Sequence, residues 1–172
     1  MKKIVLMLSI VFVLLFTMTG CLFNQNNTSE GQASVTSSDA SKNFEGTIGD
    51  FIEIENGKVT LAANKVDDGK AHFYNTTLDD GDPVYFFVVK SPDGNFRAAA
   101  NGCQVCGDAL QGFHQEGDSM VCNTCGNSYP LNKIATEKGG CNPAPINPNL
   151  EVVDGNITIS MSELESIKQF FN

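Results

Sequence analysis

The sequence has little positive charge. Lys and Arg together number 11, against 20 Asp and Glu, and the formal net charge is −9. Proteins that bind nucleic acids gather Lys and Arg on one face to neutralise phosphates. The acidic balance therefore argues against a nucleic-acid partner, and it is typical of a solvated surface that attracts cations or a basic partner.

Signatures of the common enzyme classes are also missing. The sequence shows no Ser/His/Asp nucleophile pattern, no glycine loop that would cradle a phosphate, and no carboxylate pair placed for acid–base work. Beyond residue 20 it has no apolar run long enough for a membrane helix. The sequence therefore gives no support for a hydrolase or a transferase, nor for a membrane span within the domain.

The first twenty residues resemble a bacterial lipoprotein signal peptide. Lys2 and Lys3 precede an apolar stretch over residues 4–16, and small residues then lead to Cys21. The stretch has the length of a signal-peptide core and is too short to span a membrane comfortably. We expect cleavage before Cys21 and a lipid on its sulfur, which would hold the rest of the chain outside the cytoplasm at the cell membrane. The alternative is an uncleaved N-terminal anchor, which predicts the same location.

The rest of the chain divides into two parts. Residues 21–43 carry mostly Asn, Gln, Ser, Thr and Gly, and such a segment cannot bury enough apolar surface to fold by itself. We interpret it as the lipid-bearing Cys21 and a flexible tether. Residues 44–172 have the length of one domain.

The domain is predicted to be mainly β. Asn56-Gly57 separates two alternating runs, residues 52–55 and 58–61, and predicts a hairpin. Residues 84–89 form an apolar, β-branched and aromatic run that predicts the central strand. Other strands are expected at residues 71–74 and 95–100, around Phe113 and Met120, and in a second hairpin over residues 150–159.

The C-terminus is predicted to be a short helix. Ser162 can act as its N-cap, and Glu165 would complete a capping box. The apolar side chains that would then share one face are Leu164, Ile167, Phe170 and Phe171.

Five of the six cysteines lie close together, in the pattern Cys103-x2-Cys106-x15-Cys122-x2-Cys125-x15-Cys141. Two CxxC pairs at this spacing bring four thiolates around a metal ion or cluster. Disulfides are possible outside the cytoplasm, but five thiols cannot all pair among themselves. Metal or cluster ligation therefore explains the pattern better than a disulfide framework.

Both pairs continue as CxxCG, with Gly107 and Gly126 after the second cysteine. A glycine there can adopt positive φ and lets backbone N–H groups approach the sulfurs, where they stabilise thiolate charge. This knuckle is used by zinc ribbons, by single-iron sites and by some iron–sulfur sites, so zinc, one iron ion and an iron–sulfur cluster all stay open.

The loop layout is that of a Rieske-like domain. Two ligand loops stand about this far apart, and a Gly/Pro-rich segment over residues 139–146 follows before a final hairpin. A Rieske site pairs each cysteine with a histidine, whereas this chain has cysteine at all four positions. The fifth, Cys141, exceeds the four ligands that a closed zinc site needs. It is interpreted as a ligand or a neighbour of the ligands, as a spare thiol or a disulfide partner, or as a buried structural cysteine.

Taken together, these segments resemble the FtrD-like membrane iron–sulfur protein family over about residues 51–164. The segments that carry the resemblance are residues 84–90 (VYFFVVK), 92–94 (PDG), 97–99 (RAA), 103–107 (CQVCG), 112–118 (GFHQEGD), 121–126 (VCNTCG) and 139–145 (GGCNPAP). The resemblance implies an extracytoplasmic iron–sulfur domain that handles electrons for a high-affinity iron permease system. It also implies a ligand set drawn from Cys103, Cys106, Cys122, Cys125 and Cys141. Known relatives carry membrane helices before the domain, so here a separate membrane partner, an iron permease or a redox protein, is expected.

Four other features have a functional and an ordinary interpretation. His114 lies eight residues from both Cys106 and Cys122 and is either a ligand or, more simply, a hydrogen-bonded histidine. Tyr129 is either a hydroxyl donor to a sulfur or a core aromatic. His72 is expected at an ordinary strand position. Asp79, Asp80 and Asp82 either hold a cation or form a solvated turn.

The main hypothesis is a lipid-anchored, mainly β iron–sulfur electron carrier that works with membrane iron uptake. The alternative is a four-cysteine zinc module that stabilises the domain or delivers metal. A thiol–disulfide exchanger is a third hypothesis, which the two linked CxxC pairs and their glycines favour less than ligation.

Overall fold

The computed structural model describes residues 43–172. The signal peptide predicted over residues 1–20, Cys21 and the tether up to residue 42 lie outside the described residues. The strands are β1 (Asp50–Phe51), β2 (Lys58–Ala62), β3 (His72–Thr77), β4 (Pro83–Lys90), β5 (Phe96–Cys103), β6 (Phe113–Glu116), β7 (Ser119–Cys122), β8 (Ser128–Pro130), β9 (Pro143–Leu150) and β10 (Asn156–Ser160). The helical pieces are α1 (Met161–Glu165) and four 3-10 turns, η1 (Ala63–Lys65), η2 (Gly107–Ala109), η3 (Leu131–Lys133) and η4 (Lys168–Phe170). The predicted class, mainly β with a short C-terminal helix, is confirmed.

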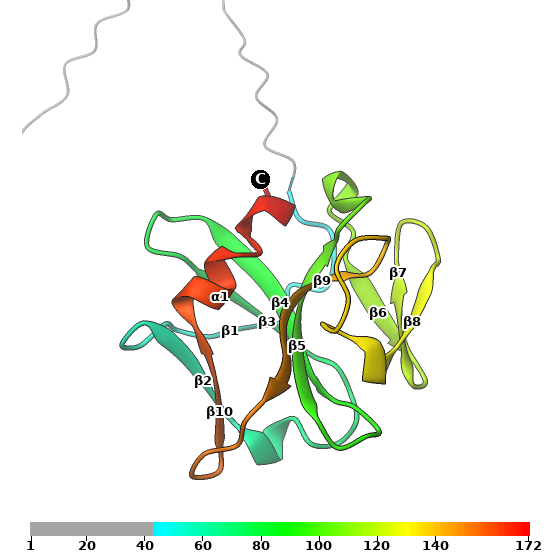
Figure 1. Cartoon of the computed structure of the whole chain (residues 1–172). Helices are drawn as coiled ribbons and strands as arrows, with labels where there is room; N and C mark the ends of the chain where they lie inside the picture. The colour runs from blue at the N-terminus through cyan, green and yellow to red at the C-terminus, as the bar shows by residue number, and fades with distance from the viewer. Residues whose placement is uncertain (1–42) are drawn as a thin grey trace, which may run out of the picture. The chain divides into compact units, whose positions relative to one another are not determined.

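Three sheets make up this part of the chain. The main sheet has the strand order β1-β3-β4-β5-β9, with β1 parallel to β3 and the other pairs antiparallel. A two-stranded ladder joins β2 to β10, and the knuckle sheet consists of β6, β7 and β8. In Figure 1 the β2–β10 ladder and α1 lie on one side of the main sheet, and the knuckle sheet lies on the other.

The prediction that residues 84–89 form the central strand is confirmed, because β4 is the middle strand of the main sheet. Successive side chains of a strand point to opposite faces. Val84, Phe86 and Val88 accordingly join one buried cluster with β2, β10 and α1, while Phe87 and Val89 join a second with the knuckle sheet. The second cluster contains Cys103 and Cys122, so the core packing of β4 positions the thiols.

Both predicted hairpins were wrong in their strand partners, although their turns are present. Asn56-Gly57 closes only a single bridge, Glu55 to Lys58, and Asp154-Gly155 lies in a similar bridge from Val153 to Asn156. Residues 52–54 are not a strand. Instead, β2 pairs antiparallel with β10 from the other end of the domain. The reason is burial: the inward side chains of the ladder, Val59, Leu61, Ile157 and Ile159, are between 0% and 8% exposed, which a local hairpin would not achieve.

The Gly/Pro-rich segment that the sequence predicts as a loop is partly a strand. Residues 143–150 form β9, at the edge of the main sheet, and its register against β5 shifts three times. Proline has no backbone N–H to donate. A strand that contains proline is therefore found at the edge of a sheet, where the backbone groups on its outer side have no neighbouring strand to bond.

The N-cap of the C-terminal helix lies two residues before the predicted one. Ser160, not Ser162, is the N-cap: its hydroxyl accepts from the Glu163 N–H at 3.3 Å, and the Glu163 carboxylate accepts from the Ser160 N–H at 2.7 Å. The predicted apolar face is confirmed at Leu164, Ile167 and Phe171, which are buried.

Replacing Ser160 with Ala should lower the free energy of unfolding by about 1 kcal/mol, because the Ser160 hydroxyl accepts from the Glu163 N–H and donates to the Glu163 carboxylate, and alanine makes neither bond. Urea unfolding followed by circular dichroism would measure it. Ser162→Ala, at the cap that the sequence predicts, is the matched control and should change the midpoint less. An equal effect of the two substitutions would contradict the capping assignment.

Candidate metal centre

Three segments carry the five clustered cysteines to one end of the knuckle sheet. Cys103 is the last residue of β5, and Cys106 lies just before η2. Cys122 is the last residue of β7, and Cys125 follows it in the turn toward β8. Cys141 lies in the loop before β9, close to the point where Pro143 pairs with Cys103. One ligand loop follows β5, one follows β7, and one precedes β9.

The sulfurs are close enough to share metal. The Cys106 Sγ lies 2.9 Å from the Cys103 Sγ and 3.5 Å from the Cys122 Sγ. Cys103, Cys106 and Cys122 form one group, and Cys106, Cys125 and Cys141 form another, with all sulfurs of a group within 4.8 Å of one another. All five cysteines are free thiols. The folded chain therefore brings together all five of the residues that the sequence nominated as ligands.

Backbone N–H groups point at the sulfurs, as the knuckle pattern predicts. The Cys106 N–H donates to the Cys103 Sγ at 3.4 Å. Burial opposes ionisation of Cys122, but hydrogen bonds from the N–H groups of Cys125 and Thr124, followed by those with the Cys106 and Cys125 thiols, outweigh it and lower the pKa of that thiol. Gly126 has the expected positive φ, 72°, whereas Gly107 begins η2, so the glycine prediction is correct only for the second knuckle.

Two of the other thiols, Cys106 and Cys141, resist ionisation. Burial, followed by hydrogen bonding with Cys103 and Cys122, raises the pKa of Cys106. Burial and contact with Cys125 raise the pKa of Cys141. Because thiolates placed this close repel one another, several can ionise together only if a cation lies among them. The donor set thus fits a thiophilic metal: soft sulfur donors, backbone N–H support and no competing disulfide.

A family model described as membrane iron–sulfur containing protein, FtrD-like, matches residues 66–171. This is more than half of the chain and includes all five clustered cysteines. The chain belongs to the FtrD-like family. Comparison with curated proteins and with solved structures found no similar protein. The family description and the thiol cluster together show an iron–sulfur type of protein with a metal-binding group of cysteines. The Rieske-like layout of the loops stays a prediction.

Within residues 43–172 of this FtrD-like chain, no helix is long and apolar enough to cross a membrane.

Gln104 holds the Cys141 loop of the FtrD-like domain against the first knuckle through hydrogen bonds. The cysteine pattern alone did not predict this role. The Gln104 side-chain Nε2 donates to the Asn142 Oδ1 and, at 3.4 Å, to the Pro143 carbonyl. Its Oε1 accepts from the Gly139 N–H at 2.8 Å, and its own N–H donates to the Asn142 carbonyl at 3.2 Å. These bonds hold both flanks of Cys141.

Asn123 occupies the same position in the second knuckle. Its side chain donates to the Gln111 carbonyl at 2.7 Å, and its N–H donates to the Gly112 carbonyl at 3.0 Å. Its Oδ1 contacts the His114 Nδ1 at 2.5 Å. The sequence did carry a signal for Gln104 and Asn123, because in both CxxC pairs a residue with a carboxamide side chain follows the first cysteine.

His114 is a hydrogen-bonded histidine, as the simpler interpretation predicted. Its Nε2 lies 3.0 Å from Glu116 Oε1, and this contact, followed by the one with Asn123, raises its pKa. Both ring nitrogens are engaged, so the ring supports the second knuckle through Asn123 rather than offering a ligand.

The remaining sequence candidates fall into two groups. Burial and then the neighbouring thiols of Cys141, Cys125 and Cys103 raise the pKa of Tyr129, so its hydroxyl lies beside the cluster. Donation of that hydroxyl to a sulfur stays a prediction. At the acidic turn, where the sequence suggested a bound cation, the ammonium group of Lys168 forms ion pairs with both Asp80 and Asp82. His72 occupies an ordinary position in β3 opposite Val88, as expected.

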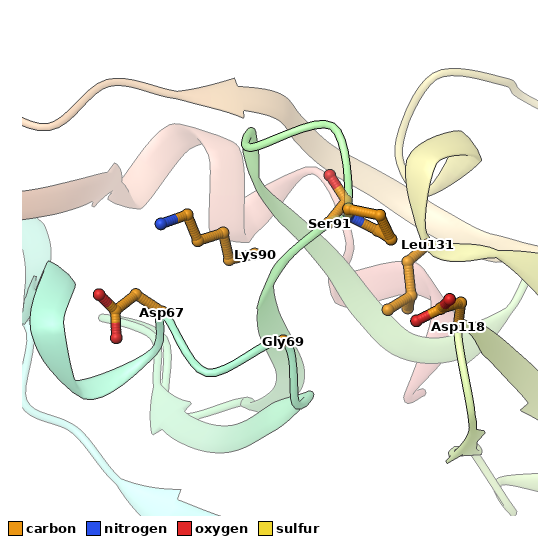
Figure 2. Close-up of a pocket in the computed structure, with 7 residues that line it drawn as sticks. Asp67, Gly69, Lys90, Ser91, Asp118 and Leu131 are labelled. Atoms are coloured by element: carbon orange, nitrogen blue, oxygen red, sulfur yellow. The ribbon is translucent and has the colours of Figure 1, made fainter.

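A pocket of about 340 Å³ lies between the turn before β3, the end of β4 and η3. Figure 2 shows Asp67 and Lys90 on one side of it and Asp118 with Leu131 on the other. No cysteine lines it. It is therefore not a route to the thiol cluster.

Replacing Gln104 with Ala should free the Cys141 loop without disturbing the core, because Gln104 is only partly buried. Each lost hydrogen bond removes about 1 kcal/mol, so the loop should open about tenfold more often or more. The measurement is the rate of Cys141 alkylation in the metal-free protein, followed by peptide mass spectrometry. Thr124→Ala, an exposed change in the other knuckle, is the control. An unchanged Cys141 rate in Gln104→Ala would show that Gln104 does not position the loop.

Proposed function

We propose that this FtrD-like protein is an iron–sulfur electron carrier, held at the outer face of the cell membrane by a lipid on Cys21, and that it supports iron uptake. The observation that carries the proposal is the convergence of five free thiols in a chain of this family. A membrane redox partner would supply one electron. The electron would pass either to iron at the outer face or to the permease that takes up the iron.

The cysteines would supply the ligands, and the rest of the chain would set their environment. Bound there, an iron–sulfur centre takes up and releases single electrons. Cys103 and Cys122 are 3% and 1% exposed and would shield the centre from water, whereas Cys125 is exposed. N–H donors to the sulfurs of Cys103 and Cys122 favour the reduced, more negative state and so raise the reduction potential.

The surface around the thiols supports contact with a partner. The three ligand loops, residues 103–107, 122–128 and 139–143, contain no charged residue in a chain that has 20 acidic and 11 basic ones. Val105, between the first two cysteines, is 66% exposed. Loops without charge that carry an exposed apolar side chain let another protein contact the thiols while desolvating few ions.

The test is to purify the full chain in detergent without oxygen, and to measure iron, acid-labile sulfide, zinc and visible absorption. We expect iron, sulfide and a visible band that dithionite bleaches. Iron uptake by cells should fall when the wild-type gene is replaced by one encoding Cys103→Ser and Cys122→Ser. A colourless zinc protein with no redox response would overturn the electron-carrier proposal.

The zinc module remains a second candidate for one reason. Sulfurs within 4.8 Å of one another are spaced as ligands of a single ion, and Zn²⁺ binds four thiolates at about 2.3 Å. The same metal analysis separates the two functions.

The lipid anchor has its own test. Cys21→Ala should release the protein from the membrane fraction into the soluble extracytoplasmic fraction, whereas wild type stays with the membrane. Retention of Cys21→Ala in the membrane would favour the uncleaved anchor.

A further inference from the structure

The five thiols form two groups rather than one. Cys103, Cys106 and Cys122 lie within 4.8 Å of one another, and so do Cys106, Cys125 and Cys141. Cys106 is the member common to both groups. The two groups also differ in depth, since Cys103 and Cys122 are buried in the core cluster that contains Phe113, whereas Cys125 is exposed and Cys141 half-buried.

The spacing decides how many metal atoms such a set can hold. Metal–thiolate bonds of about 2.3 Å place two sulfurs of one tetrahedral metal about 3.8 Å apart. Each group, with all its sulfurs within 4.8 Å of one another, is compact enough to surround a single metal. A four-iron cluster gives each thiol a different iron and separates the thiols further. One tetrahedral ion takes only four ligands and leaves the fifth thiol without a role.

We propose that the five thiols hold a two-metal centre. An inner metal binds Cys103 and Cys122, an outer metal binds Cys125 and Cys141, and Cys106 lies within reach of both. This inference rests on the proposed function and deepens it, because it sets the number of metal atoms at that site.

Burial gives the two positions different properties. The inner pair ends β5 and β7 and packs with core side chains, so it is fixed before metal binds. The outer pair lies on loops, one of them held by Gln104. The inner position should therefore bind metal more tightly, and the outer one should exchange metal with solvent.

The test combines metal analysis with cobalt titration. The full chain is purified in detergent without oxygen, its iron and sulfide are counted, and it is then stripped of metal and titrated with Co²⁺ alone. Thiolate-to-cobalt absorption reports binding. We expect two iron atoms per chain as purified and two equivalents of Co²⁺ in the titration.

A matched variant assigns the positions. Cys125→Ser with Cys141→Ser changes only the outer pair, outside the buried core, and should bind one equivalent of Co²⁺. The control, Val105→Ser with Thr124→Ser, alters the same two knuckles at exposed positions and should bind two.

The outcomes separate this inference from the proposed function. Four iron and four sulfide per chain, or one equivalent of Co²⁺ in wild type, would overturn the two-metal centre. Of these, the four-iron result would leave the electron carrier standing. Two zinc ions without sulfide would support the two-metal centre and overturn the electron carrier. Two equivalents retained by the outer-pair variant would contradict the assignment of Cys125 and Cys141.

Discussion

Replacing Cys103 and Cys122 together with serine should remove the inner metal and loosen the knuckle sheet. These two thiols are the most buried of the five and end the strands that carry the knuckles. Metal–thiolate binding contributes about 10 kcal/mol to the folding of small metal domains. Serine keeps the size of the side chain but is a poor ligand for soft metals, so the loss reflects ligation rather than a cavity.

Two measurements check this prediction. Iron content and visible absorption should fall to about half of the wild-type values or less, and amide hydrogen exchange should accelerate by more than about 100-fold in β6, β7 and β8. The main sheet should keep its protection, because the buried cluster on its other face, with β2 and β10, contains no cysteine. The double variant Val105→Ser with Thr124→Ser is the control. Normal iron content in the double cysteine variant would refute the ligand assignment.

Replacing Arg97 with Met should cause the largest loss of stability outside the thiols. Arg97 is only 5% exposed, on β5. Its guanidinium donates to the Pro148 carbonyl at 2.8 Å, to Ser91 Oγ at 3.0 Å and to Asp93 Oδ2 at 2.7 Å. Methionine fills similar volume but donates to none of them. Because the substitution removes three hydrogen bonds of a buried guanidinium, one of them to a carboxylate, we expect the free energy of unfolding to fall by about 3 kcal/mol.

Urea unfolding of the metal-free protein would measure this loss apart from any effect on metal affinity. Arg97→Lys keeps the charge but not the fork of donors, and should fall between wild type and Arg97→Met. A loss below about 1 kcal/mol in Arg97→Met would contradict the role of Arg97 in tying β9 to the turn after β4.

The same cluster predicts a pH dependence. The Ser91 hydroxyl and then the Arg97 guanidinium hold the pKa of Asp93 well below its ordinary value of 3.8. A carboxyl whose pKa is lower in the folded chain stabilises the fold above its unfolded pKa, and this stabilisation is lost as the pH falls further. Wild-type stability should therefore decline below about pH 4, and Asp93→Asn should decline less over that range. Parallel pH profiles would contradict the prediction.

The structure shows which local signals were sufficient. The apolar run of β4 was predicted as the central strand, because a strand buried on both faces must be apolar at nearly every position. Both turns, at Asn56-Gly57 and Asp154-Gly155, form because these residues accept positive φ. A turn fixes only its own residues, however. The strand after the first turn, β2, pairs with the strand after the second turn, β10, because that pairing buries Val59 and Ile157 completely.

The sequence by itself determined the chemistry of the site. Two CxxC pairs and a fifth cysteine carry soft donors whatever the chain around them does, and their close spacing along the chain brings each pair together. Only the tertiary structure decided the arrangement of those donors. Burial of Cys103 and Cys122, the grouping of the thiols around Cys106, and the tie between Gln104 and the Cys141 loop all depend on packing between segments far apart in sequence. No local pattern encodes such contacts, because each follows from how β5, β7 and β9 meet.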